Sequence, residues 1–285
     1  MDTAQTVAAL DAYLSPFRQN RERVAFVPTM GALHDGHLAL VAFAKTLAAR
    51  TVASVFVNPT QFDRAEDLAA YPRQHDRDAG LLRAAGVDVL FLPTEAVIYP
   101  EDYARPPTPD LLGLDTRFEG ARRPGHFDGV VEVVRRLVAA VRPDVMVMGQ
   151  KDAQQLAILR RAAAVEAWPV DIVGHETVRA ESGLALSSRN ARLSSEGLAK
   201  APALYEALRA TAEAVARGEG AGVAAGASRR VLAEAGWEVE YLEVVRGEDF
   251  EPIERYAAGE SASVVAAAWL EGVRLIDNVG VGDRP

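Results

Sequence analysis

Two histidines three residues apart, His34 and His37, occur in the segment PTMGALHDGHLAL, between an expected strand and an expected helix. If the helix begins near Asp35, both imidazoles lie on one side of its first turn. A helix N-terminus presents unpaired N–H groups and a partial positive charge, which suit a phosphate. Gly31 and Gly36 carry no Cβ that would obstruct a close approach. The segment predicts a phosphate-binding turn, although two surface histidines that cap a helix would fit about equally well.

Only three of the 31 basic residues are lysines, and one of them, Lys151, belongs to a second cluster. This cluster, Gly149–Asp152 (GQKD), directly follows an expected strand and opens an expected helix. A lysine there supplies a point charge for phosphate, and Asp152 can accept hydrogen bonds from ribose hydroxyls. Taken alone, Lys151 and Asp152 could instead cap the helix. Because α/β sheets bind ligands at the carboxyl ends of their strands, we expect the cluster to face the same crevice as the histidine pair.

A third group of hydrogen-bond donors is Leu186–Asn190 (LSSRN), near an expected domain junction. Two hydroxyls, a guanidinium and a carboxamide suit a phosphate chain or a leaving pyrophosphate. Two glutamines complete the candidates: Gln61 follows the second expected strand, and Gln155 lies one turn along the helix that Lys151 opens. Amides both donate and accept, so they can orient a small hydroxy acid. Serine-rich turns and surface glutamines are common, and neither signal is specific alone.

Other site chemistries fit the sequence less well. The chain has no cysteine and no HExxH segment, so a zinc site is not expected. It has no GxxxxGK[ST] phosphate loop. The segment GAGVAA, residues 220–225, matches a dinucleotide-binding fingerprint but follows an expected helix instead of a strand. We interpret it as a flexible turn. The remaining histidines show no metal-like spacing: His75, His126 and His175.

The elements that must position these residues alternate along the first half of the chain. Apolar runs predict strands at residues 23–27 (ended by Pro28), 51–57, 87–92, 144–148 and 170–173. Helical spacing falls between them, at residues 37–50, 73–85, 130–141 and 154–165. This alternation predicts an α/β fold with a doubly wound parallel sheet, within a domain of residues 1–178. The proline-rich stretch 99–123 is expected to be irregular.

The pattern of predicted helices and strands changes after about residue 178. We expect a long helix at residues 199–217, a glycine-rich break at 218–226 and a second helix to about residue 235. Strands are expected at residues 239–245, 263–270 and 274–276. Helices followed by antiparallel strands predict a smaller α+β domain over residues 179–285.

Composition excludes several classes of partner. The net charge is −9 and the sequence pI about 5.2, so no general attraction to nucleic acid or to anionic lipid is expected. The sequence has no apolar run of the length that a membrane-spanning helix needs. Its first residues lack the basic start and apolar core of a signal peptide. These features predict a cytoplasmic protein that binds neither nucleic acid nor membranes.

Seven segments, in order along nearly the whole chain, resemble the pantothenate synthetase (pantoate–β-alanine ligase) family. They are PTMGALHDGH at 28–37, FVNPTQF at 56–62, AYPR at 70–73, RPGHFDGV at 123–130, GQKDAQQL at 149–156, ALSSRN at 185–190 and RLIDN at 274–278. The HDGH segment alone would indicate only the wider nucleotidylyltransferase group. Jointly the segments are highly specific.

The resemblance implies a Rossmann-like fold of the HxGH nucleotidylyltransferase type, with a C-terminal domain that covers the active site. It implies two steps, in which pantoate attacks the α-phosphate of Mg·ATP and β-alanine then attacks the resulting pantoyl adenylate. Pyrophosphate, AMP and pantothenate are the products. ATP is a substrate and Mg²⁺ a cofactor, and the family is typically a cytoplasmic homodimer.

The resemblance also assigns residues. Gln61 and Gln155 would hold pantoate, with Gln61 also near β-alanine. His37 is usually the proton donor, but we assign it to phosphate stabilisation, because neither step as written needs a proton delivered to pyrophosphate. The expected catalytic groups are His34, His37, Lys151, Ser187, Ser188 and Arg189. The expected ATP contacts are Met30, Gly31, Ala32, Leu33, His34, Asp35, Gly36, His37, Gly149, Gln150, Lys151, Asp152, Val178, Leu186, Ser187, Ser188 and Arg189.

Three positions depart from the family pattern. Gln150 stands where glutamate is frequent, Ala153 where an aromatic is frequent, and Arg77 where an acidic residue often precedes Asp78. Asp78 is then a lone candidate magnesium ligand, so most of the coordination is expected from phosphates and water. Two rival functions remain: a nucleotidylyltransferase with a phosphorylated acceptor, and a non-catalytic adenine-nucleotide sensor.

Overall fold

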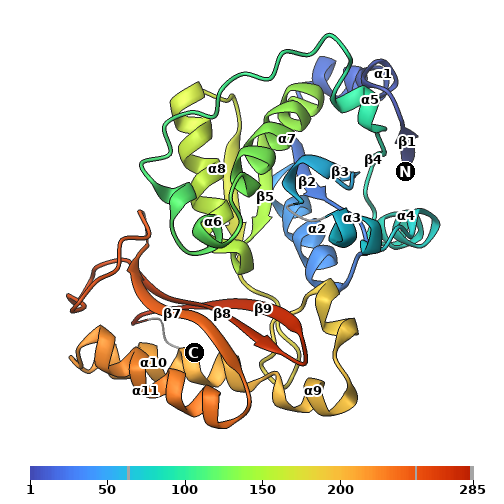
Figure 1. Ribbon diagram of the computed structural model, residues 1–285. Helices are drawn as coiled ribbons and strands as arrows, with labels where there is room; N and C mark the ends of the chain where they lie inside the picture. Colours follow the sequence, from blue (N-terminus) through green and yellow to red (C-terminus); the bar gives the residue numbers. More distant parts are fainter. Residues whose placement is uncertain (63–64, 248, 283–285) are drawn as a thin grey trace. The chain divides into compact units, whose positions relative to one another are not determined.

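The computed structural model describes residues 1–62, 65–247 and 249–282, and its contacts divide the chain into two units (Figure 1). The first unit consists of Met1–Gln150 and Gln154–Glu176. The second consists of Lys151–Ala153 and Thr177–Pro285. No helix among the described residues is long and apolar enough to span a membrane.

A six-stranded parallel sheet forms the centre of the first unit, in the order β1-β4-β3-β2-β5-β6. This confirms the predicted doubly wound α/β fold. Neither β1 nor the helix α1 (Val7–Gln19) that follows it was predicted from the sequence. The strands are β1 (Asp2–Ala4), β2 (Val24–Thr29), β3 (Arg50–Val55), β4 (Val89–Phe91), β5 (Val145–Gly149) and β6 (Asp171–His175).

Helices cover both faces of this sheet. Right-handed crossovers place α2 (Asp35–Leu47) and α4 (His75–Ala84) on one face, and α1, α7 (His126–Val141) and α8 (Ala153–Glu166) on the other. On the first face, Leu40, Val41 and Ala44 of α2 are buried in one cluster with side chains of the strands. Shorter helical elements lie in the connections: η1 (Pro59–Gln61), α3 (Ala65–Ala70), α5 (Glu95–Ile98), η2 (Leu114–Thr116), α6 (Phe118–Arg122) and η3 (Gln150–Asp152).

The strand order reverses between β2 and β5, which is where open α/β sheets bind ligands. The two strands are neighbours through the pairs Ala25↔Val145 and Phe26↔Met146. Residues 30–37 follow the carboxyl end of β2, and Gly149 ends β5. The topology therefore brings the histidine segment and the start of the GQKD segment to the same edge of the sheet.

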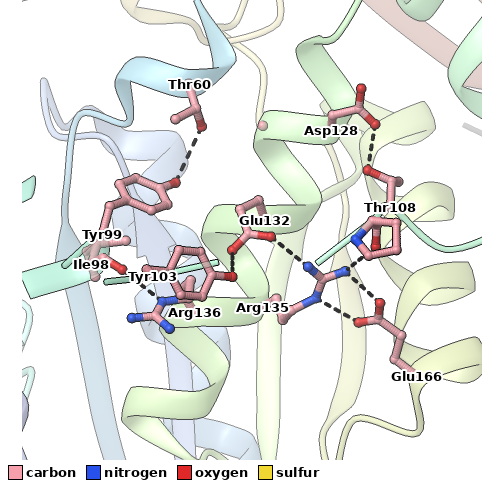
Figure 2. Close-up of polar contacts among 12 residues, drawn as sticks. Thr60, Ile98, Tyr99, Tyr103, Thr108, Asp128, Glu132, Arg135, Arg136 and Glu166 are labelled. Carbon is pink, nitrogen blue, oxygen red and sulfur yellow. Dashed lines mark hydrogen bonds and ion pairs between the residues drawn. The ribbon is translucent and has the colours of Figure 1, made fainter. Parts of the chain in front are cut away.

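The stretch 99–123 is largely irregular, as predicted, and side chains fasten part of it to α7 (Figure 2). Buried Glu132 accepts hydrogen bonds from the Tyr103 hydroxyl and from Arg135, the latter at 2.6 Å. Arg135 also pairs with Glu166 at 2.6 and 2.8 Å. Further along the segment, Thr108 donates to Asp128 at 2.6 Å. These contacts tie a segment with few backbone partners of its own to a rigid helix.

The second unit is built on an antiparallel sheet, β7 (Glu238–Arg246), β8 (Ala262–Leu270) and β9 (Val273–Gly280). Helices α10 (Ala203–Ala216) and α11 (Ala221–Glu234) pack together against it. Leu208, Val215, Leu232 and Val264 are buried in their shared core. The unit also holds η4 (Ser188–Arg192) and α9 (Ser195–Lys200).

Pro28 does not end the first expected strand. It lies inside β2, paired with Ser54 of β3. Proline cannot donate a ladder hydrogen bond, but β5 pairs with β2 only at Ala25 and Phe26. The bridge pairs between β2 and β5 thus end two residues before Pro28, so the residue that has no N–H lies beyond the hydrogen-bonded part of that ladder.

Two expectations for residues 199–226 are wrong. The long helix is interrupted at Pro202, which is the N-cap of α10, because proline is favoured at a helix start and costs about 3 kcal/mol in a helix interior. The glycine-rich segment is no flexible turn, since α11 begins at Ala221 and includes two glycines. Ala221, Ala224, Ala225, Ser228 and Leu232 form one buried face of that helix. Their burial outweighs the helix penalty of about 1 kcal/mol per glycine.

Candidate active site

The histidine pair forms the first turn of α2, which begins at Asp35 as the phosphate-site hypothesis required. His34 is the N-cap, and its Nδ1 accepts the N–H of Gly36 at 3.2 Å. His37 Nδ1 accepts the backbone N–H of His34 at 3.3 Å. The ring centroids lie 4.1 Å apart. Two imidazoles therefore do the capping work that serine and glutamate usually do.

These caps fix the protonation pattern of both rings. A backbone N–H can only donate, so Nδ1 of His34 and of His37 must carry no proton. In the neutral ring the proton then resides on Nε2. In this tautomer the proton of each ring is on Nε2, and an Nε2–H at a helix N-terminus suits a phosphate oxygen.

The turn before the histidines has left-handed backbone at Gly31 (φ +83°) and Ala32 (φ +51°). Ala32 in this conformation is strained, since its Cβ disfavours positive φ. Asp78 of α4, 1% exposed, accepts the N–H groups of Ala32 and Leu33, each at 2.9 Å. A Cβ added at Gly31 would lie 2.9 Å from Asp78 Oδ2. The buried carboxylate of Asp78 thus holds the turn in place. Residue 31 must be glycine because a Cβ there would come too close to this carboxylate.

The contacts of Asp78 favour this positioning role over a role as a magnesium ligand. Both of its oxygens accept backbone N–H groups. Among the described residues, no group of three or more histidine, aspartate or glutamate side chains could hold a metal ion. Beside it, Arg77 donates to the Leu33 carbonyl at 3.3 Å and to Gln74 at 3.0 Å. The departure at position 77 therefore places a positive charge on the same turn.

The turn after β3 holds Gln61 through Asn58, a residue that the sequence analysis did not single out. Asn58 is 1% exposed, and its Nδ2 donates to Gln61 Oε1 and to the Gly129 carbonyl, both at 3.1 Å. Its Oδ1 accepts from the hydroxyls of Thr60 at 3.0 Å and Tyr99 at 2.9 Å. Figure 2 shows Tyr99 reaching Thr60 from the irregular segment. Burial raises the pKa of Tyr99 to about 12, although its hydrogen bond with Thr60 lowers it.

His126 and Arg123, from the RPGHFDGV segment, fasten the backbone of the same turn. The Gln61 carbonyl lies 2.8 Å from His126 Nδ1 and accepts from Arg123 at 3.2 Å. His126 Nε2 lies 3.1 Å from Arg123 Nη1. A carbonyl only accepts and a guanidinium only donates, so the proton of His126 resides on Nδ1. The sequence analysis gave His126 no site role, and the signal that could have found it was this segment's match to the family.

The adjacent glutamines of α8 differ in their surroundings. Gln154, 5% exposed, accepts the Glu119 N–H at 3.1 Å and donates to the carbonyls of Leu114 at 2.6 Å and Arg117 at 2.9 Å. It therefore supports the preceding irregular segment. Gln155 is half-buried, and the described contacts include no hydrogen bond from its side chain. This leaves Gln155 as the glutamine suited to a ligand.

The second unit holds the remaining candidates. Lys151 Nζ lies 3.8 Å from Asp152 Oδ1. The Leu186 N–H donates to the Val178 carbonyl at 2.9 Å, so these two expected nucleotide contacts are paired. Ser187 Oγ accepts the Arg189 N–H at 3.2 Å and caps η4. Of the six expected catalytic groups, His34 and His37 lie in the first unit and the other four in the second, so the convergence of all six stays a prediction.

Comparisons with known proteins agree with the motifs. The family model described as pantoate-beta-alanine ligase matches residues 2–280. The pantothenate synthetase of Thioalkalivibrio sulfidiphilus is 49% identical over 100% of this chain and 99% of the relative. Two crystal structures share the fold. One is the pantothenate synthetase of Thermus thermophilus (TM-score 0.91, 45% identity, 99% of each chain).

The second crystal structure is that of a pantoate-beta-alanine ligase from Francisella tularensis, complexed with beta-gamma ATP and β-alanine. Its TM-score is 0.82 at 31% identity, over 100% of this chain and 99% of that one. Family model, relatives and solved structures thus agree over essentially the full length. The chain belongs to the pantoate–β-alanine ligase family, whose members are ligases that form an amide bond.

Proposed function

We propose that this chain joins pantoate to β-alanine in an ATP-dependent reaction that passes through a pantoyl adenylate and releases pyrophosphate and AMP. The observation that carries the proposal is the pair of capped histidines, which present two neutral Nε2–H donors at the point where the strand order reverses. Membership of the ligase family supports it, as does the Francisella structure, which is complexed with a form of ATP and with β-alanine.

In the first step, a pantoate carboxylate oxygen attacks the α-phosphorus, and the bond to the bridging oxygen of pyrophosphate breaks. Such a transfer needs positioning and charge stabilisation more than covalent help from the protein. We assign the nucleotide to Met30–His37, Gly149–Asp152, Val178 and Leu186–Arg189. Lys151 and Arg189 supply positive charge, while His34, His37, Ser187 and Ser188 donate hydrogen bonds. No protein nucleophile is required.

In the second step, the amine of β-alanine attacks the acyl carbon, AMP leaves and the nitrogen loses a proton. Gln61 and Gln155 hold the pantoyl group, and Gln61 also lies near the incoming amine. The Asn58 bond to Gln61 Oε1 orients that amide. A mixed anhydride is prone to hydrolysis, so the second unit has the role of covering the site against water.

In the proposed reaction, Mg²⁺ binds together with ATP. The described residues offer no preformed cluster of metal ligands, and Asp78 is engaged with backbone N–H groups. We assign most of the coordination to the phosphates and water, as is usual for Mg²⁺ bound with ATP. The ion would neutralise phosphate charge. The resemblance also implies a homodimer in the cytoplasm, and sedimentation of the purified chain tests the dimer.

The decisive experiment is exchange of labelled pyrophosphate into ATP. A ligase that forms an adenylate catalyses this exchange only when pantoate is present, and releases AMP only after β-alanine is added. A nucleotidylyltransferase would require a phosphorylated acceptor instead. A nucleotide sensor would bind ATP and show no exchange. Either of those results overturns the proposal.

A further inference from the structure

The peptide group of Lys151 is fastened by a side chain to which no role has been assigned, Asn278 of β9. Asn278 Nδ2 donates to the Lys151 carbonyl at 2.9 Å, and both residues belong to the second unit. The two are 127 positions apart in the sequence. Asn278 closes the RLIDN segment, whose role neither the sequence motifs nor the proposed reaction explains.

The residue beside Asn278 anchors this end of β9. The Asp277 side chain is 4% exposed, and its two oxygens accept from Arg179 at 2.6 and 2.9 Å. Arg179 also donates to the Asn278 carbonyl at 3.1 Å and stacks 3.8 Å above the ring of Tyr205. Burial raises the pKa of Asp277, while Arg179 and the charge of Lys151 oppose that rise. Asn278 is therefore presented from a rigid, well-packed backbone.

The same pair of β9 residues holds both nucleotide segments of the second unit. Arg179 directly follows Val178 and pairs with Ala185, which precedes the LSSRN segment. Asp277 thus fixes the hairpin that carries Val178 and Leu186, and Asn278 fixes the peptide that carries Lys151. The adjacent side chains of Asp277 and Asn278 therefore set the distance between the hairpin and the Lys151 peptide.

We propose that Asn278 is a positioning residue for Lys151, which it holds in register with the hairpin of residues 178–189. A lysine ammonium stands on a flexible four-carbon stem, so its reach depends on where its backbone is held. Misplacement of about 1 Å can cost two orders of magnitude in rate. The inference rests on the proposed function, in which Lys151 contacts the phosphates.

A double-mutant cycle tests it. Asn278→Ala removes the donor, and Asn278→Asp keeps the shape but turns an oxygen toward the Lys151 carbonyl. We expect each to slow pantoate-dependent pyrophosphate exchange about tenfold, with the KM for β-alanine unchanged. If Asn278 acts through Lys151, Asn278→Ala in a Lys151→Ala background changes the rate less than about twofold. The control is Val279→Ala at the next residue of the strand, whose side chain packs on the core of the second unit; it should leave the rate unchanged.

An equal loss in both backgrounds, or no loss in either, overturns the inference. A binding measurement separates it from failure of the proposed function. If the wild-type chain binds ATP but shows no exchange, the proposed reaction fails. Asn278→Ala should still weaken ATP binding about tenfold while leaving adenosine binding unchanged. Equal weakening of both ligands would indicate a general loss of structure and would contradict a role through Lys151.

Discussion

At the scale of single residues, hydrogen-bond partners decide which atoms are available for chemistry. The sequence identifies His34 and His37 as a pair, but only the backbone N–H groups on Nδ1 show that Nε2 carries the proton. In its neutral form each ring can therefore donate a hydrogen bond from Nε2. Such a donor can stabilise a phosphate oxygen without transferring its proton, as the role proposed for His37 requires.

Lys151→Ala tests the charge that the proposed transition state needs. We expect about a 100-fold or larger loss of rate with the fold unchanged, because a charged donor beside a reacting phosphate contributes several kcal/mol. Single-turnover rates and a thermal melt measure the two effects. Lys200→Ala is a matched control, since Lys200 is exposed and pairs with Glu196. Near wild-type turnover would remove Lys151 from the site.

Substitutions of the adjacent glutamines of α8 should separate an effect on pantoate binding from an effect on the free energy of unfolding. We expect Gln155→Ala to raise the KM for pantoate while the free energy of unfolding stays constant. Gln154→Ala removes a buried amide with three hydrogen bonds, so it should lower the free energy of unfolding by about 2–3 kcal/mol. Steady-state kinetics and urea denaturation provide the comparison. A normal pantoate KM in Gln155→Ala would show that the assignment is wrong.

At the scale of elements, each turn that we propose to bind a substrate is held by a helix that is remote in sequence. Asp78 of α4 supports the turn after β2. The turn after β3 packs against α7 so closely that a Cβ on Gly129 would overlap the Thr60 carbonyl. The loops that carry function thus depend on rigid elements beside them.

Asp78→Asn tests this support for the turn after β2, which we propose to bind the nucleotide. The amide can accept only one of the two N–H groups and turns a donor toward the other. We expect the free energy of unfolding to fall by about 2 kcal/mol and the KM for ATP to rise. Calorimetry and kinetics at several Mg²⁺ concentrations measure both. If Asp78 were instead a metal ligand, the main change would be a higher Mg²⁺ requirement.

At the scale of the whole molecule, the Tyr99 hydroxyl links the irregular segment to the sheet edge, and its ionisation affects global stability. Its pKa is raised to about 12 in the folded chain, against about 10 when unfolded. The folded state therefore keeps the Tyr99 proton up to a higher pH than the unfolded state does. The resulting stability is fully present below about pH 10 and is lost as the pH rises toward about 12.

Comparison with Tyr99→Phe isolates this contribution. The difference in unfolding free energy between wild type and variant should shrink between about pH 10 and 12. Tyr103, whose pKa burial also raises, titrates in both proteins and cancels. Denaturant melts across this range, with an absorbance titration of the phenolates, provide the measurement. A constant difference would mean that Tyr99 ionises no later than an exposed tyrosine.

The family, the alternation of strands and helices, and the residue types at the ends of β2, β3 and β5 all follow from the amino-acid sequence. These properties are local: apolar spacing predicts the period of a helix or strand, and a motif is a run of neighbouring residues. Prediction failed where local signals conflicted with packing. The glycines of α11 signalled a break, yet burial of one face holds them in a helix.

The hydrogen bonds that position the candidate site residues are identified only in the tertiary structure. The bonds from Asp78 to the turn after β2, from Asn58 to Gly129 and from Asn278 to Lys151 join residues 45 to 127 positions apart. No periodicity predicts such partners, because the free energy of each bond depends on burial that arises only when distant elements pack. The motifs contain the residues proposed to do the chemistry, whereas the residues that position them are identified by their contacts in the fold.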